Sequence, residues 1–128
     1  MTQVPITIGT SNSPLAFSAV VTNEGGAYDP FTGVFTAPQS GVYVFYAQLM
    51  NHIKSAWLQW AISKAGTTLL CVDHLEPGNY YDKSSCQATA RIQKGETVMV
   101  RRVTGGGPSI IEGGTYCSFT GFLLSVDA

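Results

Sequence analysis

GVYVFYAQL, residues 41–49, is apolar on both faces of an extended chain. Successive side chains of a strand point to opposite faces. One face therefore carries Val42, Val44 and Tyr46, and the other carries Tyr43, Phe45, Ala47 and Leu49. In a two-layer sandwich only one face of each strand meets the core. We expect the second face to meet a neighbouring copy of the molecule, because soluble monomers rarely expose a large apolar patch.

Short strands separated by turns are predicted on both sides of this segment. Turn signals include DPFTG at 29–33, APQSG at 37–41 and QKGE at 93–96, and the runs between them are rich in Val, Ile, Thr, Tyr and Phe. In the run 86–94, one face carries Cys86, Ala88, Ala90 and Ile92, and the other carries Gln87, Thr89, Arg91 and Gln93. Helical periodicity is absent, so the pattern is typical of an all-β sandwich or barrel.

The C-terminal run YCSFTGFLLSVDA, residues 116–128, is also strongly apolar. Alternation puts Phe122, Leu124 and Val126 on one face and Cys117, Phe119 and Leu123 on the other. We expect this strand in the centre of a sheet, because a flat apolar edge invites aggregation. The N-terminal segment VPITI would then return to pair nearby.

The composition indicates one domain over residues 1–128 and excludes several classes of partner. Hydrophobic residues make up 45% of the 128 residues, charged residues make up 12%, and the net charge is −1. Nothing in this balance attracts nucleic acid or an anionic membrane. No apolar run approaches the roughly 18 residues that a membrane helix needs. The N-terminus lacks the basic start and apolar run of a signal peptide, which favours a mature chain.

Seven residues between positions 17 and 45 follow the spacing of a known signature. They are Phe17, Asn23, Tyr28, Phe35, Gly41, Tyr43 and Phe45. Their pattern resembles the globular-head family of complement C1q, within the C1q/tumour-necrosis-factor superfamily. QKGETVMV at 93–100 and SFTGFLLS at 118–125 resemble later segments of the same family. The resemblance covers nearly the whole chain, with Ala47 standing where the family usually has an aromatic residue.

This resemblance implies a ten-stranded antiparallel jelly roll that forms a compact homotrimer. In the family the aromatic-rich strands line the three-fold axis, so we expect Tyr43, Phe45 and Phe122 at the subunit contact. Three cysteines indicate one bridge and one buried thiol. A cysteine pair in the matching region bridges in relatives, which implies a Cys71–Cys86 disulfide and leaves Cys117 as a core thiol.

The segment 71–82 is the first candidate ligand site. It concentrates oxygen-bearing side chains, namely Asp73, Glu76, Asn79 and Asp82, beside Tyr80 and Tyr81. Such oxygens suit calcium, and tyrosine faces suit sugars. Acidic residues of the matching loop hold calcium in some trimeric relatives, which implies Asp73 and Asp82 as metal ligands, with one extra residue between them and His74 replacing an acid. The alternative is a solvated loop whose acids cap turns.

Arg101 and Arg102 form the second candidate ligand site. Because they alternate on a strand, we expect one of them to face outward, where it would bind a phosphate, sulfate or carboxylate. The alternative is an ion pair at the surface or between subunits. Trp57 and Trp60 should lie on opposite faces of their segment, with one in the core and the other at a subunit contact or exposed for stacking.

No catalytic residues are predicted. His52 and His74 are the only histidines, and the chain has neither a G-x-S-x-G elbow nor an H-E-x-x-H motif. We expect a secreted, extracellular, lectin-like pattern-recognition module of innate immunity. It would bind microbial or cell-surface carbohydrates or other anionic ligands, with calcium as the one cofactor considered. The alternatives are a cytokine-like or organiser-like ligand of a protein receptor and a structural trimerisation head.

Overall fold

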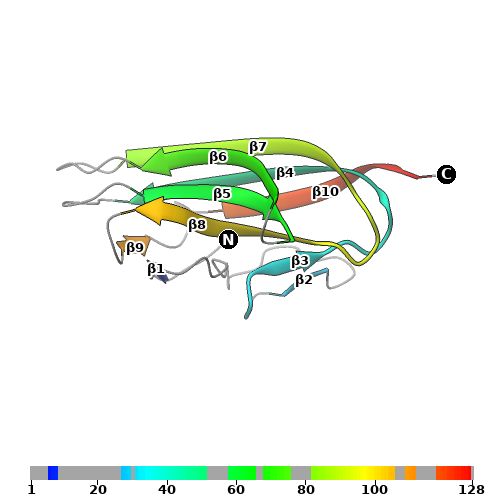
Figure 1. Ribbon diagram of the computed structural model, residues 1–128, viewed down its shortest axis with the longest axis horizontal. Helices are drawn as coiled ribbons and strands as arrows, with labels where there is room; N and C mark the ends of the chain where they lie inside the picture. The colour runs from blue at the N-terminus through cyan, green and yellow to red at the C-terminus, as the bar shows by residue number, and fades with distance from the viewer. Residues whose placement is uncertain are drawn as a thin grey trace.

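The computed structural model describes residues 6–8, 27–29, 31–51, 58–65, 68–75, 82–105, 109–111 and 118–127. Ten strands lie in this part: β1 (Ile6–Ile8), β2 (Tyr28–Asp29), β3 (Val34–Thr36), β4 (Gly41–Asn51), β5 (Leu58–Lys64), β6 (Thr68–Leu75), β7 (Asp82–Ile92), β8 (Thr97–Gly105), β9 (Ser109–Ile111) and β10 (Ser118–Val126). The long strands run along the long axis of the molecule (Figure 1). No helix in these ranges is long and apolar enough to cross a membrane.

The strands form two antiparallel sheets and one separate pair. The first sheet has three strands in the order β10-β4-β7, and the second has five in the order β2-β3-β8-β5-β6. β1 pairs with β9. The fold class predicted from the sequence, an all-β antiparallel sandwich, is confirmed.

The inner face of β4 forms the centre of the core. Tyr43, Phe45, Ala47 and Leu49 are all buried within one chain. Phe35 of β3 joins the two sheets, with its ring 5.7 Å from that of Tyr43 and 5.4 Å from that of Phe45, measured between centroids. The prediction that Tyr43 and Phe45 lie at a subunit contact is therefore wrong: both side chains face the opposite sheet. The two-faced alternation is correct, but its outward side is the one with Val42, Val44 and Tyr46.

β7 follows the alternation predicted for residues 86–94, and the pattern continues to Gln93 just after the strand. Cys86, Ala88 and Ile92 are buried, whereas Gln87, Thr89, Arg91 and Gln93 are exposed. Ser84 continues the inward face and is buried, and its Oγ accepts a hydrogen bond of 2.5 Å from Nε1 of Trp60 on β5. Trp60 is thus the predicted core tryptophan, and Trp57 lies outside the described residues.

β10 differs from its predicted place and alternation. Among the described strands it lies at one edge of its sheet, next to β4, and Ile6–Ile8 of the VPITI segment pairs with β9 instead. A bulge between Leu123 and Ser125 shifts the register, so that Val126 lies opposite Gly41. Because a one-residue shift exchanges the two faces, Val126 no longer continues the face of Phe122.

The two sheets are joined covalently along one side. β6 and β7 are the edge strands of different sheets, and the predicted Cys71–Cys86 disulfide connects them with a Cα–Cα distance of 6.1 Å. Oδ2 of Asp73 accepts a hydrogen bond of 3.1 Å from the backbone N–H of Ser85 just beyond the bridge. This side of the sandwich is therefore closed, and Cys117 lies outside the described residues.

Candidate functional site

An apolar stripe covers part of the outer face of the three-stranded sheet. It consists of Val42, Val44, Tyr46 and Phe122, and Phe122 lies directly opposite Val44 in the β10–β4 register. The exposed fractions of Phe122, Leu124 and Val126 are 51%, 60% and 58%, so β10 presents apolar side chains to solvent along its second half. The apolar outward face expected from the sequence is present at the stripe, whereas Val126 lies beyond the bulge and does not continue it.

The stripe ends at β7, where the same face becomes polar. Thr89 lies opposite Val44 and Gln87 lies opposite Tyr46, and both are exposed. On the same face of β10, Thr120 and Ser125 lie opposite Tyr46 and Val42, so the apolar part is confined to the stripe itself, and the part over β7 is polar. The sequence of β4 does not indicate this orientation, because alternation puts one polar residue on each face: Gln48 with Val44, and Asn51 with Tyr43.

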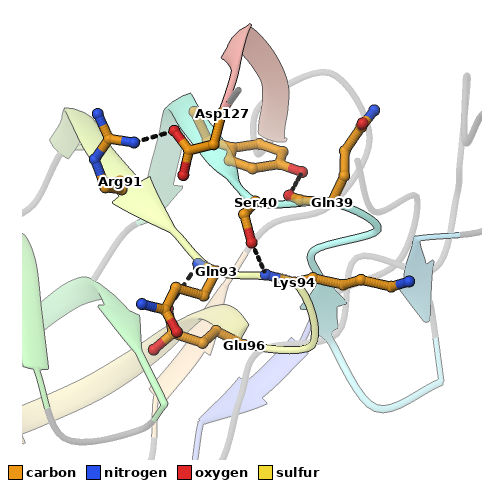
Figure 2. Close-up of polar contacts among 8 residues, drawn as sticks. Gln39, Ser40, Arg91, Gln93, Lys94, Glu96 and Asp127 are labelled. Atoms are coloured by element: carbon orange, nitrogen blue, oxygen red, sulfur yellow. Dashed lines mark hydrogen bonds and ion pairs between the residues drawn. The ribbon is translucent and has the colours of Figure 1, made fainter.

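Polar contacts hold the end of β10 beside the stripe (Figure 2). The carboxylate of Asp127 forms an ion pair with Arg91 of β7, and its backbone N–H donates to the carbonyl of Ser40 at 3.0 Å. Ser40 Oγ accepts a hydrogen bond of 2.8 Å from the backbone N–H of Lys94. The C-terminal end, the β3–β4 turn and the β7–β8 turn therefore form one connected rim.

The β7–β8 turn is stabilised by Glu96. Its Oε1 accepts a 2.7 Å hydrogen bond from the backbone N–H of Gln93, and its Oε2 lies 3.7 Å from Nζ of Lys64 on β5. Gly95 has a positive φ of 88°, which glycine adopts without steric cost. The polar groups named in the rim are therefore hydrogen-bonded or ion-paired within the turns. Among these described residues, no cluster indicates a metal site or a catalytic group.

The predicted metal ligands receive little support at Asp73. Its Oδ1 accepts a 2.9 Å hydrogen bond from the backbone N–H of His74, and its Oδ2 is used by Ser85, so both oxygens already have donors. No group of three His, Cys, Asp or Glu side chains able to hold a metal ion occurs among the described residues. Asp82 is the first residue of β7, but its side chain lies outside the described part of the chain. Tyr80 and Tyr81 lie entirely outside it. The calcium site stays a prediction.

Arg101 and Arg102 do not form the exposed site predicted for them. The exposed fractions are 6% for Arg101 and 5% for Arg102. Arg102 lies opposite Trp60 on the inward face, whereas Arg101 lies opposite Ala61 on the other face, where its Nε donates a 3.1 Å hydrogen bond to Ser63 Oγ. The alternation was predicted correctly, but Ala61 and Ser63 are buried as well. The sequence of β8 does not predict that Arg101 is buried on this face, because arginine is usually found on a solvent-exposed face.

Comparisons with known proteins agree with this architecture. The family described as C1q domain matches residues 1–124. The chain belongs to the C1q domain family. Its sequence is 34% identical over 113 residues to complement C1q tumor necrosis factor-related protein 3 of Mus musculus, covering 88% of this chain and 45% of that protein. The C1q domain described here thus spans about half the length of that curated relative.

Solved structures show the same fold. The globular domain of zebrafish complement 1qA matches with a TM-score of 0.70 and 18% identity over 96% of each chain. The TNF protein Eiger from S. frugiperda matches with a TM-score of 0.76 and 18% identity over 100% of this chain and 89% of that one. The predicted jelly roll of the C1q/TNF type is therefore confirmed for this C1q domain.

Proposed function

We propose that this C1q domain is a secreted, homotrimeric binding module that recognises microbial or cell-surface carbohydrates in innate immunity, without catalysis. The apolar stripe over β10 and β4 carries this proposal. Phe122 exposes 51% of its surface there although it lies in a well-paired strand. A soluble chain gains by burying such a face against copies of itself.

A three-fold assembly fits the division of the outer face. Rings of identical chains use heterologous contacts, in which two different surfaces of each copy meet. The outer face of the sheet carries the apolar stripe over β10 and β4 and polar side chains over β7. The stripe can therefore supply one of the two surfaces of such a contact. Domains of the C1q and TNF type typically associate as trimers, in line with this arrangement.

Secretion is supported by the disulfide. Cys71 and Cys86 join two sheets of a small domain, and disulfides of this kind persist in oxidising compartments outside the cytosol. Three copies of a weak sugar site would gain strength by avidity, without any catalytic group. Tyr80 and Tyr81 stay the predicted sugar contacts, whereas the burial of Arg101 and Arg102 removes them from the proposed ligand surface.

Two measurements test the proposal. Analytical ultracentrifugation at micromolar concentration should give the mass of three chains. A glycan array probed with the same preparation, with calcium and with EDTA, should show binding to a restricted set of carbohydrates. A single-chain mass would contradict the assembly, and uniform background on every glycan would contradict the ligand class.

A further inference from the structure

The turn between β2 and β3 displays one aromatic side chain almost entirely to solvent. Phe31 has an exposed fraction of 92%, the highest among the large hydrophobic side chains of the described residues. It lies in the DPFTG segment that the sequence predicts as a tight reversal, and this reversal is confirmed. Burying a phenylalanine side chain stabilises a fold, and the described part of this chain does not bury Phe31.

Hydrogen bonds to Asp29 hold the turn in one conformation. The backbone N–H of Phe31 donates to Oδ1 of Asp29 at 2.9 Å, and the N–H of Gly33 donates to the Asp29 carbonyl at 2.8 Å. Gly33 is buried and has a φ of 79°, so the chain reverses at a position that favours glycine. Local bonding of this kind is how aspartate fixes a turn.

The hairpin beneath the turn is anchored in the aromatic core. The ring of Tyr28 on β2 packs edge-to-face on Phe119 of β10 with centroids 5.8 Å apart, and Phe35 on β3 packs on Phe45 at 5.4 Å. Phe31 is therefore carried by a rigid support. A preordered backbone turn loses little conformational entropy when a partner binds the side chain that it carries.

Phe31 belongs to a different surface from the apolar stripe. β2 is an edge strand of the five-stranded sheet, whereas the stripe covers the outer face of the three-stranded sheet. In Figure 1 the β2–β3 hairpin lies along the lower side of the molecule, beside β8. The hairpin packs on β10 through Tyr28 and Phe119, but a contact confined to the stripe does not include Phe31.

We propose that the Phe31 turn is a docking knob that inserts into an apolar pocket of a partner protein whose rim carries Lys or Arg. Solvent-exposed aromatic anchors that fill a pocket are the side chains that dominate protein interfaces. Asp29 is exposed, its carboxylate binds the backbone N–H of Phe31, and it is the one charged residue between positions 25 and 39. This negative charge complements a basic rim and opposes attraction to an anionic lipid surface.

The test uses disulfide-cyclised peptides displayed on phage, selected on the wild-type protein. Enriched peptides should combine apolar residues with Lys or Arg, and Phe31→Ala should weaken their Kd by about tenfold or more. Asp29→Asn keeps an oxygen to accept the Phe31 N–H but removes the charge, so it should flatten the salt dependence of binding. Leu69→Ala, which shortens an exposed side chain on β6, is the matched control and should leave Kd unchanged.

Three results would overturn the proposal. The first is a selection in which no peptide depends on Phe31, because either no peptide is enriched or every enriched peptide binds Phe31→Ala as tightly as wild type. The second is cosedimentation with phosphatidylcholine–phosphatidylserine vesicles that Phe31→Ala abolishes, which would assign the ring to lipid. The third is a change of oligomeric mass in Phe31→Ala, which would assign it to a second copy. The peptide measurement needs neither a trimer nor a glycan and is independent of the function proposed above.

Discussion

At the scale of single residues, the position of Gly121 on β10 admits only glycine because of the ring of Phe45. A Cβ added at Gly121 would lie 2.7 Å from Cδ1 and 2.8 Å from Cε1 of the buried Phe45 ring, which is too close for either atom. We expect Gly121→Ala to destabilise the fold by about 1–3 kcal/mol through overpacking, measured by urea unfolding. Combining it with Phe45→Leu should cost less than the sum of the two single variants, because leucine removes the ring atoms that the methyl meets. Strictly additive costs would contradict this explanation.

A second residue-scale prediction concerns the hydrogen bond between the sheets. Ser84→Ala leaves the buried Nε1–H of Trp60 without its 2.5 Å acceptor, and an unsatisfied buried donor costs about 1–3 kcal/mol. Ser85→Ala is the matched control: its side chain is exposed and its bond to Asp73 uses the backbone, so the change should stay within about 0.5 kcal/mol. Equal midpoints for the two variants in urea would show that the Trp60 bond does not matter.

At the scale of elements, the disulfide joins the two sheets on the side where β6 meets β7. Cys71 and Cys86 are 15 residues apart in sequence, and closing a loop of that length contributes roughly 3 kcal/mol through the unfolded state. The Cys71→Ser/Cys86→Ser double variant should lose about this much, measured by urea unfolding under oxidising conditions. Dithiothreitol should lower the stability of wild type by a similar amount and leave the double variant unchanged. A wild type insensitive to reduction would contradict the prediction.

The elements also show how far sequence patterns reach. Strict alternation in 86–94 predicted both faces of β7, because one face is wet and the other dry. Alternation alone could not orient β4, whose two faces are both apolar, and Tyr43 and Phe45 were therefore placed on the wrong side. The bulge near Leu123 and the burial of Arg101 depend on how neighbouring strands approach, which a single strand's sequence does not encode. The disulfide was predicted because the resemblance supplied a pairing that three cysteines leave open.

At the scale of the whole molecule, the stripe and the polar side chains of β7 on the same sheet give opposite expectations for one substitution. Phe122→Asp places a charge in the stripe, where a contact between copies would bury it unpaired at a cost of several kcal/mol. Sedimentation should then show self-association weakened more than roughly 100-fold. Thr89→Asp places the same charge on β7, with only Val44 between the two positions across the sheet, and should leave the assembly intact. Both side chains are exposed in the single chain, so neither variant should unfold the domain, and both should keep the far-UV circular dichroism spectrum of wild type. If Phe122→Asp associates like wild type, the contact lies elsewhere on the molecule and the stripe has another purpose.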